Sequence, residues 1–180
     1  MKDITVLASG HGTNYSAIIQ NGIPVSHVVT NNPDAGIIAK AHNDGTYWSI
    51  IEQGNDSRDQ WGSHLISIIG NPDLIVCAGF MKILPHNVCE EYRGKIINLH
   101  PSLLPAYKGS VRAIEDAYND GSTVYGATVH YVTENVDDGE IIAQESITVD
   151  SECTLEHVEE LVHRVEHSLL PKTIREILAL

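Results

Sequence analysis

The first half of the chain alternates short apolar runs with segments of helical periodicity, and this alternation constrains the fold more than any other feature. Apolar runs of strand length lie near residues 3–8, 26–30, 73–77 and 95–99, with a weaker run near 47–51. Helical patterns lie between them, at residues 14–21, 35–43 and 57–70. Units of this kind build parallel strands covered by helices. We therefore predict an α/β fold with a mostly parallel sheet in this half.

The second half has a different pattern. Residues 125–132 and 141–149 are β-rich runs separated by a polar, glycine-containing segment, which predicts an antiparallel pair. Residues 154–178 have helical periodicity, and we expect Pro171 to end or kink that helix. No repeat, linker or low-complexity segment interrupts the chain, so we expect a single domain over residues 1–180.

Charge and composition narrow the classes of function. A net charge of −13, with only 11 lysines and arginines, argues against a nucleic-acid-binding surface. An anionic small ligand would need backbone N–H groups, a helix N-terminus and a few placed cations. No signal segment or apolar stretch of membrane-spanning length occurs, which predicts a cytoplasmic protein without a membrane partner. The three cysteines form no C-x-x-C pair, so neither a disulfide framework nor a metal site is predicted.

The segment A-S-G-H-G-T-N at residues 8–14 is the first candidate site. It follows a predicted strand and opens a predicted helix, where glycines and free N–H groups favour phosphate binding. It matches neither the dinucleotide-binding nor the Walker pattern. A tight turn capped by Thr13 or Asn14 explains the same residues.

The segment N-L-H-P-S-L-L-P at residues 98–105 is the second candidate. Ligands of open α/β sheets bind beyond the carboxyl ends of the strands, where Asn98 and His100 would emerge. Residues i and i+2 of a strand share a face, so the two side chains should lie together. An amide can donate to an oxyanion, and an imidazole can polarise a carbonyl or move a proton. A capping asparagine and a loop histidine are the alternative.

Three weaker candidates remain. The acidic segment at residues 134–139 could orient a histidine or accept a proton, although a plain hairpin turn explains it as well. His163 and His167 have metal-ligand spacing without an H-E-x-x-H motif, which favours an ordinary helix face. Ser9 and Ser102 lack a G-x-S-x-G elbow, which disfavours a serine hydrolase.

Taken together, these motifs resemble the 10-formyltetrahydrofolate-dependent formyltransferases, and most closely the branch whose acceptor is phosphoribosylglycinamide (GAR). The similarity spans most of the chain. It rests on S-G-H-G-T-N at 9–14, D-S-R at 56–58, A-G-F-M-K-I-L at 78–84, I-N-L-H-P-S-L-L-P at 97–105, G-A-T-V-H-Y-V at 126–132, V-D-D-G-E-I-I-A-Q at 136–144, T-L-E at 154–156 and E-H-x-x-L-P at 166–171.

The resemblance implies a Rossmann-like formyltransferase fold with helices on both faces of the sheet. It implies a phosphate-binding N-terminal half, about residues 1–95, and a folate-binding and catalytic C-terminal half, about 96–180. Its implied catalytic residues are Asn98, His100 and Asp137, the last chosen over Asp138 by its spacing to Gly139. Its implied GAR-binding residues are Gly12, Thr13, Asn14 and Glu166, and its implied folate-binding residues are Arg58, Phe80, Met81, Lys82, Ile83, Leu84 and Asp137.

The implied reaction is attack of the GAR amine on the formyl carbon of 10-formyltetrahydrofolate, the cosubstrate. Asn98 and His100 would hold the tetrahedral oxyanion, with Asp137 favouring the imidazolium form of His100. No metal is implied, and the protein would be a monomer or a homodimer. Alternatives are a formyltransferase with another acceptor, a formyltetrahydrofolate hydrolase, or a non-catalytic folate- or nucleotide-binding module. Three segments depart from the family pattern: His11, Lys82 in place of arginine, and residues 108–113 with an additional residue.

Overall fold

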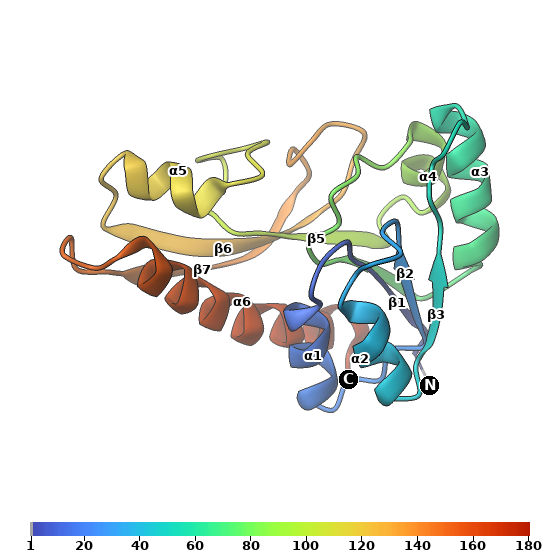
Figure 1. The fold of residues 1–180 in the computed structure, drawn as a ribbon, viewed down its shortest axis with the longest axis horizontal. Coiled ribbons are helices and arrows are strands. Elements are labelled where there is room, and N and C mark those ends of the chain that lie inside the picture. The colour runs from blue at the N-terminus through green and yellow to red at the C-terminus, as the bar shows by residue number, and fades with distance from the viewer. Residues whose placement is uncertain (1) are drawn as a thin grey trace.

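A computed structural model describes residues 2–180, in which seven strands form one mixed sheet (Figure 1). Their spatial order is β3-β2-β1-β4-β5-β6-β7. The strands are β1 (Ile4–Leu7), β2 (His27–Thr30), β3 (Tyr47–Ile50), β4 (Leu74–Cys77), β5 (Ile96–His100), β6 (Val124–Tyr131) and β7 (Ile141–Thr148). The first five strands pair in parallel, whereas β6 pairs antiparallel with both β5 and β7. The predicted division into a parallel and an antiparallel half is confirmed.

Six helices accompany the sheet in the described part of the chain. They are α1 (Thr13–Gln20), α2 (Ile37–Asn43), α3 (Arg58–Ile69), α4 (His86–Glu91), α5 (Ala113–Asn119) and α6 (Leu155–Leu178). The sequence did not predict α4 and α5, which are six and seven residues long. A helix of this length shows only a weak period, although α2, also of seven residues, was predicted from its pattern. The start of α3 was predicted well: Ser57 and Gln60 form a capping box.

Helices cover both faces of the sheet, as predicted (Figure 1). Alternate residues of each strand point to opposite faces, so Ile4 and Val6 pack in one buried cluster with residues of α1, α2 and α6. Leu7 and Ile75 pack in the other with residues of α3 and α4. Near-continuous apolar runs such as Leu74–Cys77 are expected where helices bury both faces of a strand.

The prediction for Pro171 was wrong in part, because α6 does not end there. The helix continues from Leu155 to Leu178 with Pro171 buried inside it. Proline removes one helical N–H donor, but Leu169, Leu170 and Ile174 anchor this part of α6 in the core. Tertiary packing of an apolar helix face outweighs the local cost.

The strand order reverses next to β1, which lies between β2 and β4. Chain segments leaving β1, β4 and β5 therefore meet at one edge of the sheet, where open α/β folds bind ligands. None of the helices within residues 2–180 combines the length and the apolar character that a membrane span requires.

Candidate active site

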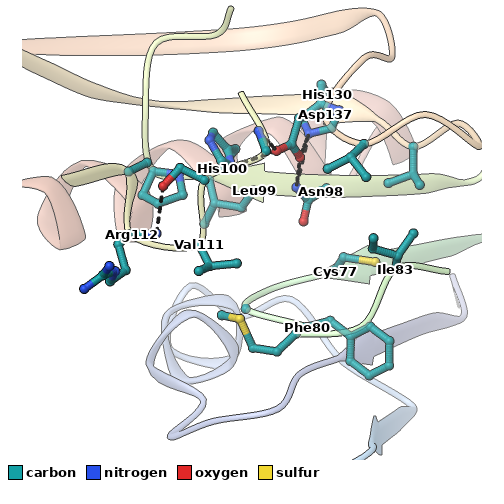
Figure 2. A pocket seen from close by; sticks show the side chains of 18 of the residues that line it. Cys77, Phe80, Ile83, Asn98, Leu99, His100, Val111, Arg112, His130 and Asp137 are labelled. Carbon is teal, nitrogen blue, oxygen red and sulfur yellow. Dashed lines mark hydrogen bonds and ion pairs between the residues drawn. The ribbon is translucent and has the colours of Figure 1, made fainter. Parts of the chain in front are cut away.

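A cavity of about 660 Å³ opens at the carboxyl ends of β4 and β5, a volume ordinary for a small-molecule site. Four chain segments far apart in the sequence supply its walls, and Figure 2 shows part of this lining. They are the segment after β4, the end of β5 with residues 109–115, the turn between β6 and β7, and one side of α6. Asn14 adds a contribution from the start of α1.

His100 and Asp137 form a buried pair in this cavity. His100 ends β5, and its Nδ1 lies 3.4 Å from Oδ2 of Asp137. Asp137 lies in the turn between β6 and β7, and its backbone has φ of 50°. The backbone N–H of Gly109 donates to the same Oδ2 at 2.9 Å. The acidic segment is therefore a hairpin turn and also a wall of the cavity.

The Asn98 side chain lines the same cavity and contacts Asp137. Its Nδ2 is 3.1 Å from Nε2 of His130 and 3.4 Å from Oδ1 of Asp137. Figure 2 shows the nitrogen turned toward these two residues and the amide oxygen turned away from them. The sequence predicted a donor to an oxyanion at Asn98, whereas in this arrangement the amide nitrogen already faces two acceptors.

Burial lowers the pKa of His100, and the Asp137 carboxylate and the Tyr107 carbonyl oppose this shift without overcoming it. The two groups face opposite ring nitrogens, since Nε2 lies 3.2 Å from the Tyr107 oxygen. We predicted that Asp137 would favour the imidazolium form, and this attraction is present, but desolvation is the larger effect. Burial also acts on Asp137, raising its pKa, but contacts with His130, His100 and Gly109 outweigh it, so the net pKa of Asp137 is lowered.

The phosphate-loop candidate has the backbone that the sequence predicted. Gly12 has φ of 72° and stands at the N-cap of α1, where no side chain caps the helix. The first N–H groups of α1 are therefore left without a side-chain acceptor. Asn14 lines the cavity, and its buried Oδ1 has no hydrogen-bond partner among the described residues. Gly12 and Thr13 lie beside the cavity rather than in its lining.

The five predicted folate-binding residues from Phe80 to Leu84 all line the cavity. The Phe80 ring is stacked on Trp61, with centroids 6.4 Å apart. Arg58 lies outside the lining, and its Nη2 donates to the carbonyl oxygens of Ile83 and Leu84, each at 3.2 Å. Arg58 thus holds the chain segment that forms this wall.

Glu166 lies on the α6 side of the cavity and is only 4% exposed. Its Oε2 is 2.6 Å from Nδ1 of His163, which also lines the cavity. The hydrogen bond with Glu166 raises the pKa of His163, against the opposing effect of burial. The ring of His163 stacks on that of His167, so the two histidines share one face of α6.

Cys77 also contributes to the wall, opposite Asn98 in the register of β4 and β5. Burial raises the pKa of this thiol to about 12, so it is a neutral side chain rather than a nucleophile. Within residues 2–180, no cluster of three or more histidine, cysteine or acidic side chains has an arrangement that could hold a metal ion.

Comparison with known proteins assigns the chain to a family. A family model described as "Formyl transferase" matches residues 2–174. The chain belongs to the formyl transferase family. Among its formyl transferase relatives, phosphoribosylglycinamide formyltransferase of Bacillus subtilis is 35% identical over 100% of this chain and 96% of its own length.

Solved structures of family members agree with this assignment. The crystal structure of phosphoribosylglycinamide formyltransferase from Streptococcus pneumoniae has a TM-score of 0.94 and 31% identity, covering 99% of each chain. The enzyme from Coxiella burnetii has a TM-score of 0.89 and 38% identity, covering 95% of this chain and 84% of its own. The predicted formyltransferase fold is confirmed.

Sequence reasoning missed His130 in this formyl transferase site. Its motif, G-A-T-V-H-Y-V, was noticed, but nothing in the sequence indicated that β6 would pair with β5 and set His130 opposite Asn98. It left open the role of residues 108–113, and the structure sets residues 109–115 in the wall. The hydrogen bond from Gly109 to Asp137 ties this segment to the predicted catalytic residues.

Proposed function

We propose that this protein transfers the formyl group of 10-formyltetrahydrofolate to the amine of GAR, giving formyl-GAR and tetrahydrofolate in purine biosynthesis. One observation carries this proposal: a single cavity is lined by Asn14, by the His100–Asp137 pair and by the mostly apolar residues 80–84. The relatives described above support the same reaction, because their names give phosphoribosylglycinamide as the formyl acceptor.

The reaction forms one C–N bond and breaks another. The amine nitrogen of GAR attacks the formyl carbon, and the carbonyl oxygen becomes an oxyanion in the tetrahedral intermediate. The bond from that carbon to N10 of the folate then breaks, and the proton lost by the amine is delivered to N10. An active site for this reaction must hold negative charge on the oxygen and pass on one proton.

His100 is the donor that we assign to the oxyanion. Its Nε2 faces the Tyr107 carbonyl in this structure, and the formyl oxygen would replace that carbonyl as the acceptor. Before the reaction, burial disfavours the protonated form of the His100 ring. During the reaction, the negative charge that develops on the formyl oxygen favours that protonated form. Asp137, at the other ring nitrogen, stabilises the same charged state.

Asp137 acts in this proposal as a fixed anion rather than a proton carrier. Its lowered pKa makes its carboxylate a weak base. An ordered water is therefore the better route for the proton from the amine to N10. The Asp137 charge orients and stabilises the His100 ring, as the carboxylate of a histidine–carboxylate pair does.

We assign the two substrates to different parts of the cavity. Gly12, Thr13 and Asn14 would bind the GAR phosphate through the free N–H groups at the start of α1. Glu166 would contact the glycinamide part. Residues 80–84 would contact the folate, with Lys82 meeting its anionic end and Arg58 supporting the wall from behind. Both halves of the chain contribute, which supports a single domain.

The deciding experiment is a formyl-transfer assay on the purified protein, with GAR present and with GAR omitted. We expect consumption of 10-formyltetrahydrofolate only with GAR present, and formyl-GAR as the product. Consumption without GAR would instead identify a hydrolase. No consumption in either case would contradict the proposed acceptor. The cytoplasmic location and the choice between monomer and homodimer stay predictions.

A further inference from the structure

Ser9 is a buried serine to which the reaction above assigns no role. It lies two residues after the end of β1 and three residues before Gly12, and it is 9% exposed. It lies outside the lining of the cavity, so it is not placed to contact a substrate. The sequence disfavoured Ser9 as a nucleophile, but its hydrogen bonds in the structure indicate a different role.

The backbone of Ser9 is held on both sides by neighbouring chain segments. Its N–H donates to the carbonyl oxygen of Gly79 at 3.0 Å. Its own carbonyl oxygen accepts a hydrogen bond from Nδ2 of Asn32 at 3.1 Å. Gly79 follows β4 and Asn32 follows β2, and these two strands are the neighbours of β1 in the sheet. Ser9 therefore joins the segments that leave three adjacent strands.

The hydroxyl of Ser9 makes two further hydrogen bonds. It donates to Oδ1 of Asn31, and it accepts from the backbone N–H of Met81 at 2.8 Å. A hydroxyl has one hydrogen and two lone pairs, so donation to Asn31 leaves an acceptor for Met81. Every hydrogen-bonding group of Ser9 thus has a partner, and its side chain supplies the acceptor that the Met81 N–H needs.

These bonds connect the two segments to which we assign the substrates. Met81 belongs to the wall at residues 80–84, the proposed folate contact. Only two residues separate Ser9 from Gly12, where the proposed phosphate contact begins. A short path of hydrogen bonds therefore sets the spacing between the two segments.

We propose that Ser9 is a positioning residue that fixes the distance between the phosphate-binding segment and the folate-binding wall, and so aligns the acceptor amine with the formyl carbon. This inference rests on the proposed function. An acceptor that is held at its phosphate reaches the formyl group only if the two segments keep their spacing. A misplacement of about 1 Å can cost roughly 10²-fold in rate. An acceptor without a phosphate is not held at residues 12–14, so it does not depend on this spacing.

The test compares GAR with dephosphorylated GAR as acceptors for the native protein and for Ser9→Ala. We expect kcat/KM for GAR to fall roughly 10- to 10²-fold in the variant. The value for dephosphorylated GAR should change little, so the preference for the phosphate should shrink by nearly the same factor. An equal loss with both acceptors would overturn the proposal, because Ser9 would then act through general stability. An unchanged value for GAR would overturn it as well.

Ser26→Ala is the matched control. The Ser26 hydroxyl also accepts a backbone N–H, that of Ile4 at 3.1 Å, but Ile4 begins β1 at the end away from Ser9. We expect native kinetics with both acceptors. A similar loss of phosphate preference in Ser26→Ala would overturn the proposal, since the effect would not depend on the place of the hydroxyl. Failure of the native protein to formylate GAR would instead overturn the proposed function.

Amide hydrogen exchange tests the link without turnover. We expect the Met81 amide to exchange several-fold faster in Ser9→Ala than in the native protein, because it has lost its acceptor. Amides of β5, such as that of Ile97, should keep their native rates. Native protection of Met81 in the variant would overturn the proposal.

A second variant keeps the proposal testable if Ser9→Ala does not fold. Asn31→Ala retains the serine but removes the acceptor that orients its hydroxyl. We expect it to lower the preference for the phosphorylated acceptor in the same direction. An unchanged preference in folded Asn31→Ala would then overturn the proposal.

Discussion

Nδ1 of His100 lies 3.4 Å from Oδ2 of Asp137, and the side chains are only 6% and 11% exposed. The two residues come from different structural elements, the end of β5 and the turn between β6 and β7. Low exposure strengthens their electrostatic interaction because little solvent screens it. This pair is the part of the cavity where we expect the reaction to be most sensitive to substitution.

Asp137→Asn keeps the shape of the side chain and removes its charge. We expect kcat to fall by roughly 10² or more, because the imidazolium that forms at His100 loses its anionic partner. The matched control is Asp138→Asn, whose carboxylate pairs with Lys108 at the surface. Steady-state kinetics should find the control near normal. A larger loss in the control would transfer the proposed role to Asp138.

His100→Ala removes the proposed oxyanion donor. The expected loss in turnover is roughly 10²- to 10³-fold, with folding retained. His157→Ala is the control, because His157 lies on α6 outside the cavity lining and pairs with Glu160 at the surface. Kinetics and circular dichroism on both variants check this. Near-normal turnover of folded His100→Ala would remove His100 from the mechanism.

Gly12→Ala should destabilise the protein in two ways. A residue with a side chain is strained at φ of 72°, by about 1–3 kcal/mol. An added Cβ would also lie 2.8 Å from the Cβ of Ile37. Gly45→Ala is the control, since Gly45 has φ of 70° but no heavy atom within 4 Å of an added Cβ. Urea unfolding should give the larger loss for Gly12→Ala. Equal losses would mean that the contact with Ile37 relaxes freely.

Arg58→Ala should weaken folate binding without affecting GAR. The guanidinium donates hydrogen bonds to the carbonyl groups of Ile83 and Leu84. Its loss removes these two bonds, so the chain segment that forms the wall of the cavity is held less firmly. We expect KM for 10-formyltetrahydrofolate to rise several-fold while KM for GAR stays constant. Arg93→Ala, which removes an exposed arginine paired with Glu90, is the control. A parallel rise in both KM values would contradict a local role.

The His163–Glu166 pair should make stability depend on pH. The Glu166 contact raises the pKa of His163, so the folded protein binds this proton more tightly than the unfolded chain does. The resulting stabilisation is fully present below the ordinary histidine pKa of about 6.5 and is lost as pH rises through the raised value. Urea unfolding from about pH 6 to pH 9 should therefore show the advantage over His163→Gln shrinking as pH increases. A constant difference would contradict this linkage.

Much of the fold could be predicted from local patterns. Apolar runs identified the strands to within one or two residues, because two-sided burial in a parallel sheet requires continuous apolar sequence. The same reasoning placed Asn98 and His100 at a ligand-binding edge, where they lie. The prediction that α6 could end at Pro171 was wrong because it considered only the neighbouring residues. It took no account of how the C-terminal part of α6 packs in the core.

The rest of the site depends on contacts between distant segments. His130 and Asn98 are neighbours because β6 pairs with β5, and no local pattern specifies which strands pair. The folate contact expected of Arg58 stays a prediction. What the sequence did not indicate is that Arg58 also donates to the backbone carbonyl groups of Ile83 and Leu84, which a sequence does not distinguish from any others.

The order of the strands has a consequence for the protein during its own synthesis. The loop at the start of α1 and the segment after β4 emerge from the ribosome early, whereas Asp137 follows β6 and the supporting face of α6 comes last. A nascent chain that has not yet passed β6 carries the segments that we propose for the GAR phosphate and for the folate, but lacks the carboxylate beside His100. These two proposed binding segments are therefore translated before the chemical centre is complete.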